Sequence, residues 1–332
     1  MCNRCRRHHE PAVVEQPQAA VPASVAPPAR TYAKWRLKLL CFGAVLAVAS
    51  DLAVAAPAPE WYRIISIKEL GAVPPGDQNT FGINADGALC GAYVVGANWH
   101  AFVWLPDAMY GMNAGFHDLH TAAGLSSSAS SVANHISDNG FVAGVIDGLG
   151  ATSTSGEAAV WKLGEEVDSV GLGLLTGDWS VAYAINDHAS TLTVVGAAEL
   201  DVSGCNELPA FAGFRAVVNS DLTIATAMTQ LIEIDTMDGD VDDVAFDVNN
   251  DSTPRIVGAT TPACGTFNTG PCDSSTRATN WVRGGSAIAM PNLLASPSDR
   301  EHRARGNNDT GQAVGYSTAW SSTSVCDLRA IV

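Results

Sequence analysis

Basic residues are scarce in this chain of 332 residues, in which 18 lysines and arginines stand against 34 aspartates and glutamates. Seven of the basic residues lie within residues 1–55, so the remainder carries 11 basic and 31 acidic side chains and a formal net charge of −20. A surface of that sign repels phosphate backbones, and we expect no nucleic-acid partner. The charge is compatible with cation binding or with solubility alone, and solubility is the favoured interpretation.

The short motifs of common reaction centres are also missing. There is no G-x-S-x-G elbow, no H-E-x-x-H pair and no G-x-x-x-x-G-K-[ST] loop. His117 and His120 are three residues apart, which places their rings on opposite faces of an extended strand. The sequence favours a non-catalytic protein and predicts no organic cofactor.

Long apolar runs are limited to residues 39–50, about half the length of a membrane span. Four basic residues precede this run and small residues follow it at positions 53–55. This pattern predicts that residues 1–55 are an n-region with a cleaved export signal. We therefore expect an extracellular or periplasmic protein whose mature chain has no membrane span.

What the chain does have is an internal repeat. The stretch GINADGALCGAY (82–93) has four downstream relatives, each an apolar strand, an Asn- or Asp-rich turn and a return strand with a closing glycine. Asn and Asp close such turns readily, so each unit predicts a β-hairpin. The closing glycines are Gly91, Gly144, Gly196, Gly258 and Gly315.

A third strand follows each hairpin: HAFVW (100–104), EAAVW (157–161), RAVVN (215–219), RATNW (277–281) and RAIV (329–332). The first position is polar and varied, so we interpret His100 as a rim residue of the scaffold rather than a site. The second position is always Ala, as expected where sheets pack closely. Trp104, Trp161 and Trp281 are predicted packing anchors.

Fourth strands are predicted at residues 115–121, 167–175, 228–235 and 287–294, and a similar strand at residues 61–70 precedes the first hairpin. Four antiparallel strands per repeat are typical of a β-propeller blade. The sequence predicts an all-β domain over residues 56–332. Its approximate blades are 71–121, 122–175, 176–235, 236–294 and 295–332, and residues 61–70 complete the last blade by pairing with residues 329–332. The alternative is an open fragment of a larger propeller.

The elements GINADGALCG and HAFVW, preceded by SIKELGAV, resemble the extracellular HAF-repeat proteins of bacteria. The resemblance spans roughly residues 61–332 and is strongest in the first repeat. It implies a repeat fold and an exported location, and it implies no particular activity or catalytic residue.

An acidic stretch separates the third and fourth repeats. We expect it in the loop between an outer strand and the next inner strand, where carboxylates could coordinate Ca²⁺ or support glycoside hydrolysis. The candidate calcium ligands are Asp235, Asp238, Asp240 and Asp242. A solvated loop without a ligand is the alternative.

Five cysteines remain after residue 55. Cys90 aligns with Ala143, Val195, Val257 and Val314, which predicts a buried free thiol. Cys205, Cys264, Cys272 and Cys326 lie in long loops, and export permits their oxidation. Either Cys264–Cys272 and Cys205–Cys326 pair, or Cys205–Cys264 and Cys272–Cys326 do.

Two functions are consistent with these features. The first is an exported non-catalytic propeller that binds a carbohydrate, a protein or a cell-surface ligand through its loops. The second is an exported hydrolase or lyase that acts on glycans with carboxylates at the channel mouth. A purely structural envelope component is a third possibility.

Overall fold

The computed structural model describes residues 74, 77–147, 156–188, 190–201, 210–231, 241–262, 277–282, 287–290, 300–320 and 326–331. All of them belong to one compact unit that begins at Ser66. None of the helices in these ranges is long and apolar enough to cross a membrane.

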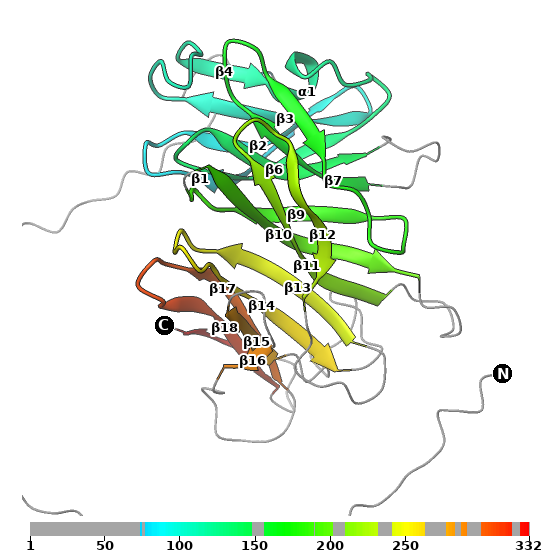
Figure 1. Ribbon diagram of the computed structural model, residues 1–332, viewed down its shortest axis with the longest axis vertical. Helices are drawn as coiled ribbons and strands as arrows, with labels where there is room; N and C mark the ends of the chain where they lie inside the picture. Colours follow the sequence, from blue (N-terminus) through cyan, green and yellow to red (C-terminus); the bar gives the residue numbers. More distant parts are fainter. Residues whose placement is uncertain are drawn as a thin grey trace, which may run out of the picture. The chain divides into compact units, whose positions relative to one another are not determined.

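The described residues form five antiparallel sheets, one per sequence repeat, and the strands of each sheet follow chain order (Figure 1). The first sheet is β1 (Gln78–Ile83), β2 (Leu89–Val95), β3 (Asn98–Leu105) and β4 (Gly115–Asp118), and the second is β5 (Ser131–Ile136), β6 (Phe141–Asp147), β7 (Gly156–Lys162) and β8 (Asp168–Gly171). The third is β9 (Ser180–Ile185), β10 (Thr191–Leu200), β11 (Ala210–Asn219) and β12 (Ile224–Gln230). The fourth is β13 (Val241–Val248), β14 (Arg255–Pro262), β15 (Arg277–Val282) and β16 (Ala287–Ala289), and the fifth is β17 (Arg300–Asn307), β18 (Ala313–Trp320) and β19 (Cys326–Ile331).

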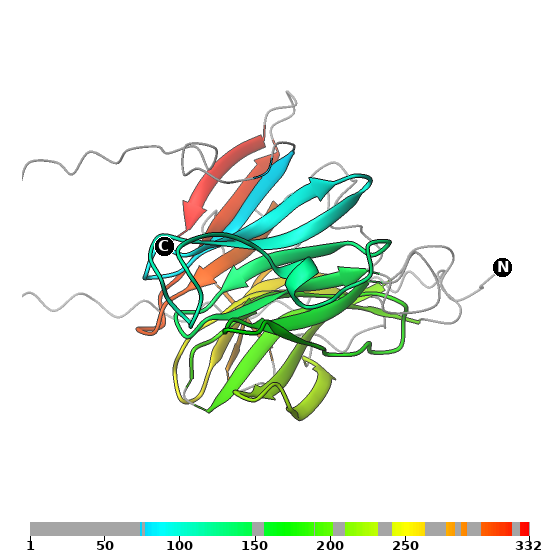
Figure 2. The ribbon, with the colours of Figure 1, turned by 90° about the horizontal axis from the view of Figure 1, so that it is seen from above.

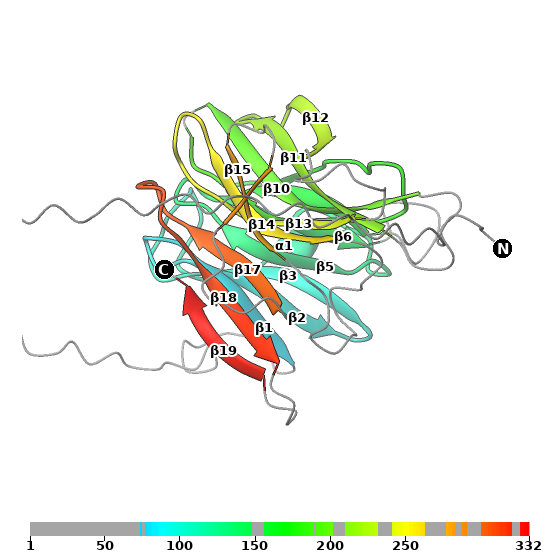
Figure 3. The same ribbon diagram turned by 90° about the horizontal axis from the view of Figure 1, so that it is seen from below.

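The prediction of an all-β fold with four-stranded antiparallel sheets is confirmed for the first four repeats. The fifth sheet has three described strands, with β19 at its edge (Figure 3). Residues 61–70, the predicted fourth strand of this sheet, lie outside the described residues. Their pairing with the last strand stays a prediction.

Three fourth strands differ from the sequence prediction. In the second repeat, β8 ends at Gly171, four residues before the predicted end. In the first repeat, β4 ends at Asp118, and residues 119–122 form the single helical turn α1 (Leu119–Ala122) instead of continuing the strand (Figure 2). The cause is local, because the Asp118 side chain accepts a 2.9 Å hydrogen bond from the Thr121 N–H and caps the turn. In the third repeat, β12 begins at Ile224, four residues before the predicted start.

The closing glycine of each hairpin faces a β-bulge in the first strand. All five first strands shift register at this point, and a Cβ on any of the five glycines would overlap the main chain of the opposite strand. The overlapping carbonyl groups belong to Asn79, Val132, Val181, Val244 and Arg303. The glycine recurs because no side chain fits between the two main chains.

An aromatic ring covers the closing glycine in the first four sheets. The rings belong to Phe102, Trp161, Phe214 and Trp281, and all four are fully buried. Trp161 and Trp281 are the packing anchors that the repeat predicted. In the first sheet the prediction was wrong, because Phe102 occupies this place and Trp104 is only partly buried.

Successive sheets pack through one recurring contact. The first strand of each following sheet crosses the first three strands of the sheet before it, so that β5 contacts β1, β2 and β3, and β9, β13 and β17 do the same in turn. The alanines at the second position of the third strand lie within these layers and are buried, as predicted: Ala101, Ala158, Ala216 and Ala278.

The hairpin turns are joined by a chain of hydrogen bonds that crosses every sheet boundary. The main-chain N–H of each turn donates to a side-chain oxygen in the next turn, over 2.6 to 2.9 Å. The donors are Ala85, Asp138, Asp187 and Asn250, and the acceptors are Asp138, Asp187, Asn250 and Asp309, which we call the Asx ladder. The turn-forming Asn and Asp residues therefore also link the sheets.

A glycine-to-alanine pair tests the bulge constraint within one sheet. Gly196→Ala places a methyl group against the Val181 carbonyl and the Phe214 ring, whereas Gly213→Ala on the neighbouring strand meets only ordinary van der Waals contacts. We expect Gly196→Ala to lower the free energy of unfolding by about 2–4 kcal/mol through overpacking, as measured by urea denaturation. We expect Gly213→Ala to change it by less than about 1 kcal/mol. Equal effects would contradict the account.

Removal of one ladder carboxylate tests the links between sheets. Asp187 accepts hydrogen bonds from the main chain of both Asp138 and Asn139, at 2.9 and 3.0 Å. We expect Asp187→Ala to lower the free energy of unfolding by about 1–2 kcal/mol. Asp86→Ala, in the exposed part of the first turn and outside the ladder, serves as the control and should be neutral within about 0.5 kcal/mol. A neutral Asp187→Ala would show that the ladder adds no stability.

Candidate functional site

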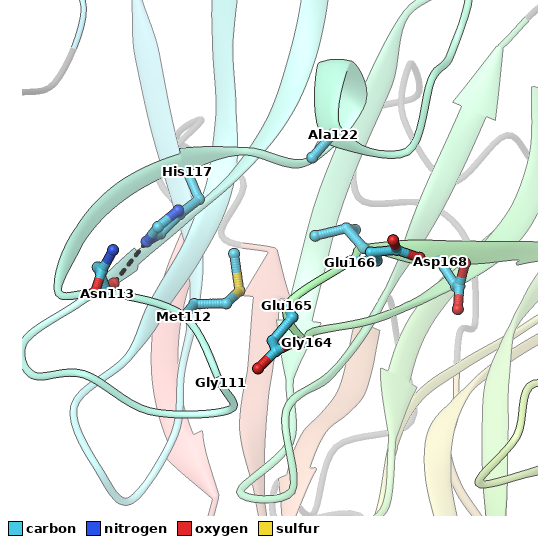
Figure 4. Close-up of a pocket in the computed structure, with 10 residues that line it drawn as sticks. Gly111, Met112, Asn113, His117, Ala122, Gly164, Glu165, Glu166 and Asp168 are labelled. Carbon is cyan, nitrogen blue, oxygen red and sulfur yellow. Dashed lines mark hydrogen bonds between the residues drawn. The ribbon is translucent and has the colours of Figure 1, made fainter.

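A pocket of about 570 Å³ lies between two loops of the first and second sheets (Figure 4). One wall comes from the β3–β4 connection, β4 and α1, and the other from the β7–β8 connection. The volume falls in the range of small-molecule sites. The lining residues are Gly111, Met112, Asn113, His117, Ala122 and residues 164–168.

The pocket wall of the β3–β4 connection is held by a tight turn. Met109 and Met112 exchange two main-chain hydrogen bonds of 3.1 and 2.9 Å, and Tyr110 and Gly111 between them both have positive φ. A left-handed tyrosine is unusual and needs support from its surroundings. The Tyr110 hydroxyl accepts a 2.7 Å hydrogen bond from the Asn84 side chain, and its ring packs on Gly140.

Half of the ten lining residues are polar, and three of these five are acidic. His117 donates a 2.7 Å hydrogen bond from Nε2 to the Asn113 carbonyl, and these two residues lie on one side of the pocket (Figure 4). Glu166 and Asp168 lie across from them, and both are exposed. The arrangement offers carboxylates, an amide and one imidazole to a ligand. The sequence pattern placed His117 and His120 on one extended strand, which is wrong for His120 because it lies in α1. No signal in the sequence pointed to the acidic loop.

His100 lies in a buried polar network rather than at an exposed rim, so the expected location was wrong. The residue is only 6% exposed, and its Nδ1 lies 3.1 Å from Asp118 Oδ2. The Tyr93 hydroxyl donates to the same oxygen at 2.8 Å. Burial raises the pKa of Asp118. Hydrogen bonds from Thr121, His100 and Tyr93 lower this pKa by more, so the net shift is downward. These contacts give His100 a role in packing.

His120 forms a second part of this network and stacks on His100 with ring centroids 3.9 Å apart. Its Nε2 lies 2.9 Å from the Ser126 carbonyl, which can only accept, so Nε2 carries the proton. Nδ1 then accepts from the Ser131 hydroxyl at 2.9 Å. Burial lowers the pKa of His120 below its ordinary 6.5. Because the unfolded chain binds this proton more readily, His120 favours folding less as the pH falls below about 6.5.

A serine bound to a histidine resembles an activated nucleophile, but the repeat shows a structural role. Ser131 is 1% exposed, and its Oγ also accepts from the Ala101 N–H at 2.9 Å. Ser180, its equivalent in the next repeat, accepts from Ala158 at the same distance and has a main-chain partner, Gly173, in place of the histidine. Both serines connect a third strand to the following sheet.

The acidic stretch that begins at Asp235 lies partly outside the described residues and partly in strand β13. Asp235, Asp238 and Asp240 lie outside the described residues. Asp242 was expected in the loop but belongs to β13, where it is paired with Thr261. Asp243 and Asp247, which continue the acidic stretch, also lie in β13, where Asp243 is buried and Asp247 is partly buried. Within the part of the chain that the structure describes, no three His, Cys, Asp or Glu side chains group closely enough to hold a metal ion.

The cysteine predictions are confirmed for one residue. Cys90 is a buried free thiol, and burial raises its pKa. Cys205, Cys264 and Cys272 lie outside the described residues, and for Cys326 only the main chain in β19 is described. Both proposed disulfide pairings therefore stay predictions.

Sequence comparison does not assign the chain to a family. No protein-family model matches the chain, and no curated protein is significantly similar to it. The resemblance to HAF-repeat proteins rests on the motifs alone and stays a prediction.

The buried carboxyl group of Asp247 predicts a specific pH dependence. Burial raises its pKa from 3.8 to about 6, although the Asn307 N–H donates to it at 2.7 Å. The unfolded chain loses this proton first, so folding loses up to about 3 kcal/mol as the pH rises from about 4 to 6. We expect Asp247→Asn, which retains an acceptor oxygen, to remove this loss. The check is urea unfolding of both proteins at pH 4.5 and 7. An unchanged difference between the two pH values would contradict the prediction.

Proposed function

We propose that the chain is an exported, non-catalytic repeat protein whose β-propeller-like blades carry a binding site for a carbohydrate. Support for export comes from the apolar run and its basic flank, and support for the blades comes from five repeats with the same hairpin, bulge and third strand. In this proposal residues 61–70 supply the fourth strand of the fifth blade. The other ligands that fit the proposal are a protein and another cell-surface component.

The pocket of Figure 4 carries the proposal. Its carboxylates, amide and imidazole are groups that hydrogen-bond to sugar hydroxyls, and Met112 adds an apolar surface for the face of a sugar ring. Its two loops stand on paired strands, which limits the cost of ordering them when a ligand binds.

The pocket is tested by glycan-array binding followed by a hydrolysis assay on every glycan bound. We expect binding without turnover. We expect Glu166→Ala and His117→Ala to weaken it by about tenfold, since each removes a hydrogen bond of about 1.4 kcal/mol. Asp221→Ala, in the exposed β11–β12 turn, is the control and should bind as the unchanged protein does.

Three results would change the assignment. Turnover of a bound glycan would replace the proposal by the hydrolase or lyase alternative. Binding that the pocket variants leave unchanged would move the site elsewhere on the chain. Absence of binding to any glycan would favour a protein or cell-surface ligand.

A further inference from the structure

The first strand of the first sheet exposes an apolar side chain whose equivalents in the next three sheets are buried. Ile83 precedes the turn residue Asn84 and is 66% exposed. The equivalent residues of the next three sheets, Ile136, Ile185 and Val248, are at most 5% exposed because the preceding sheet covers them. An isoleucine suited to a sheet–sheet interface therefore faces outward at the start of the array.

The fifth sheet exposes the complementary position. Val314 precedes the closing glycine Gly315 and is 48% exposed. The equivalent residues Cys90, Ala143, Val195 and Val257 are at most 2% exposed because the following sheet covers them. In the inner interfaces these two positions belong to the same hydrophobic clusters, as with Cys90 and Ile136, Ala143 and Ile185, and Val195 and Val248. Among the described residues, Val314 shares no hydrophobic cluster with a residue equivalent to Ile136 or Ile185, which the first strand of a further sheet would provide.

The bulged residues add a second complementary pair. In the third to fifth sheets they contact one another in sequence: Tyr183 packs on Phe246 with ring centroids 5.7 Å apart, and the Arg305 guanidinium lies 3.9 Å from the centre of the Phe246 ring. The bulged residue of the first sheet is Phe81, which is 53% exposed. The second sheet has Asn134 at this position, so the row of contacts begins at Tyr183. The exposed Arg305 at one end of the array and the exposed Phe81 at the other are a cation and an aromatic ring, which form a favourable pair.

We propose that a second copy of this chain covers these faces, so that the first sheet of one copy packs on the fifth sheet of another, head to tail. The interface repeats the apolar pairing that the chain forms three times between its own sheets, with Ile83 against Val314, and it brings Phe81 against Arg305. Among the described strands, none of the first sheet packs extensively on one of the fifth. This inference does not rest on the proposed carbohydrate site.

A heterologous contact of this kind produces a closed ring of copies or an open polymer, depending on the rotation between neighbours.

The mass of the mature chain in solution, measured by light scattering across a range of concentrations, tests the association. We expect particles of two or more chains. We expect Ile83→Asp and Val314→Asp each to raise the dissociation constant by about tenfold or more, because either variant buries a carboxylate in the interface. Ile224→Asp, on the exposed β12 strand, should leave the mass unchanged. A monomer at every concentration would overturn the proposal.

Cysteine cross-linking identifies which chain covers the faces. A mixture of Ile83→Cys chains with Val314→Cys chains should form a disulfide between the two kinds of chain, and neither single variant should do so alone to the same extent. If the double variant instead closes a disulfide within one chain and the mixture forms none, the chain closes on itself and the proposal is wrong. Glycan binding is read separately, so its failure does not affect either result.

Discussion

The structure depends on a hydrogen bond between the main chain of one hairpin turn and the Asx side chain of the next. When a hairpin closes, the first N–H groups of its turn point away from the hairpin and have no partner within it. Without the next turn, only water could accept their hydrogen bonds. Asp138, Asp187, Asn250 and Asp309 accept them in turn and fix the offset between neighbouring sheets. The first turn has Ala85 at this position, which has no side-chain oxygen. The first turn can therefore donate to the next turn but cannot accept such a hydrogen bond itself.

A second constraint fixes the distance between strands inside each sheet. The closing glycine lies so close to the bulged strand that only a hydrogen atom fits, and the space above it is filled by the ring of Phe102, Trp161, Phe214 or Trp281. The bulge turns one residue per sheet toward the neighbouring sheet, which creates the row that runs through Tyr183, Phe246 and Arg305. Loops between these rigid elements, including the pocket walls, are free to vary without disturbing the repeat.

Much of this architecture was predictable because the repeat appears five times. The hairpins, the third strands, the buried alanines and the thiol of Cys90 all follow from aligned positions. Single-residue effects were not predictable: the Asp118 cap turns the end of one strand into α1, and Asp242, Asp243 and Asp247 lie in a strand although acidic residues favour loops. The pocket was missed because its lining comes from two loops of different repeats. The ladder did leave a signal, namely the recurrence of Asp or Asn two residues after the strand.

Hydrogen exchange of the turn amides tests the ladder most directly. The account predicts slow exchange for the N–H groups of Ala85, Asp138, Asp187 and Asn250, close to that of the paired strands. The amides of Asp86 and Asp251, in the same turns but outside the ladder, should exchange much faster. Equally fast exchange at all six positions would show that the turns are independent and that packing alone holds the sheets together.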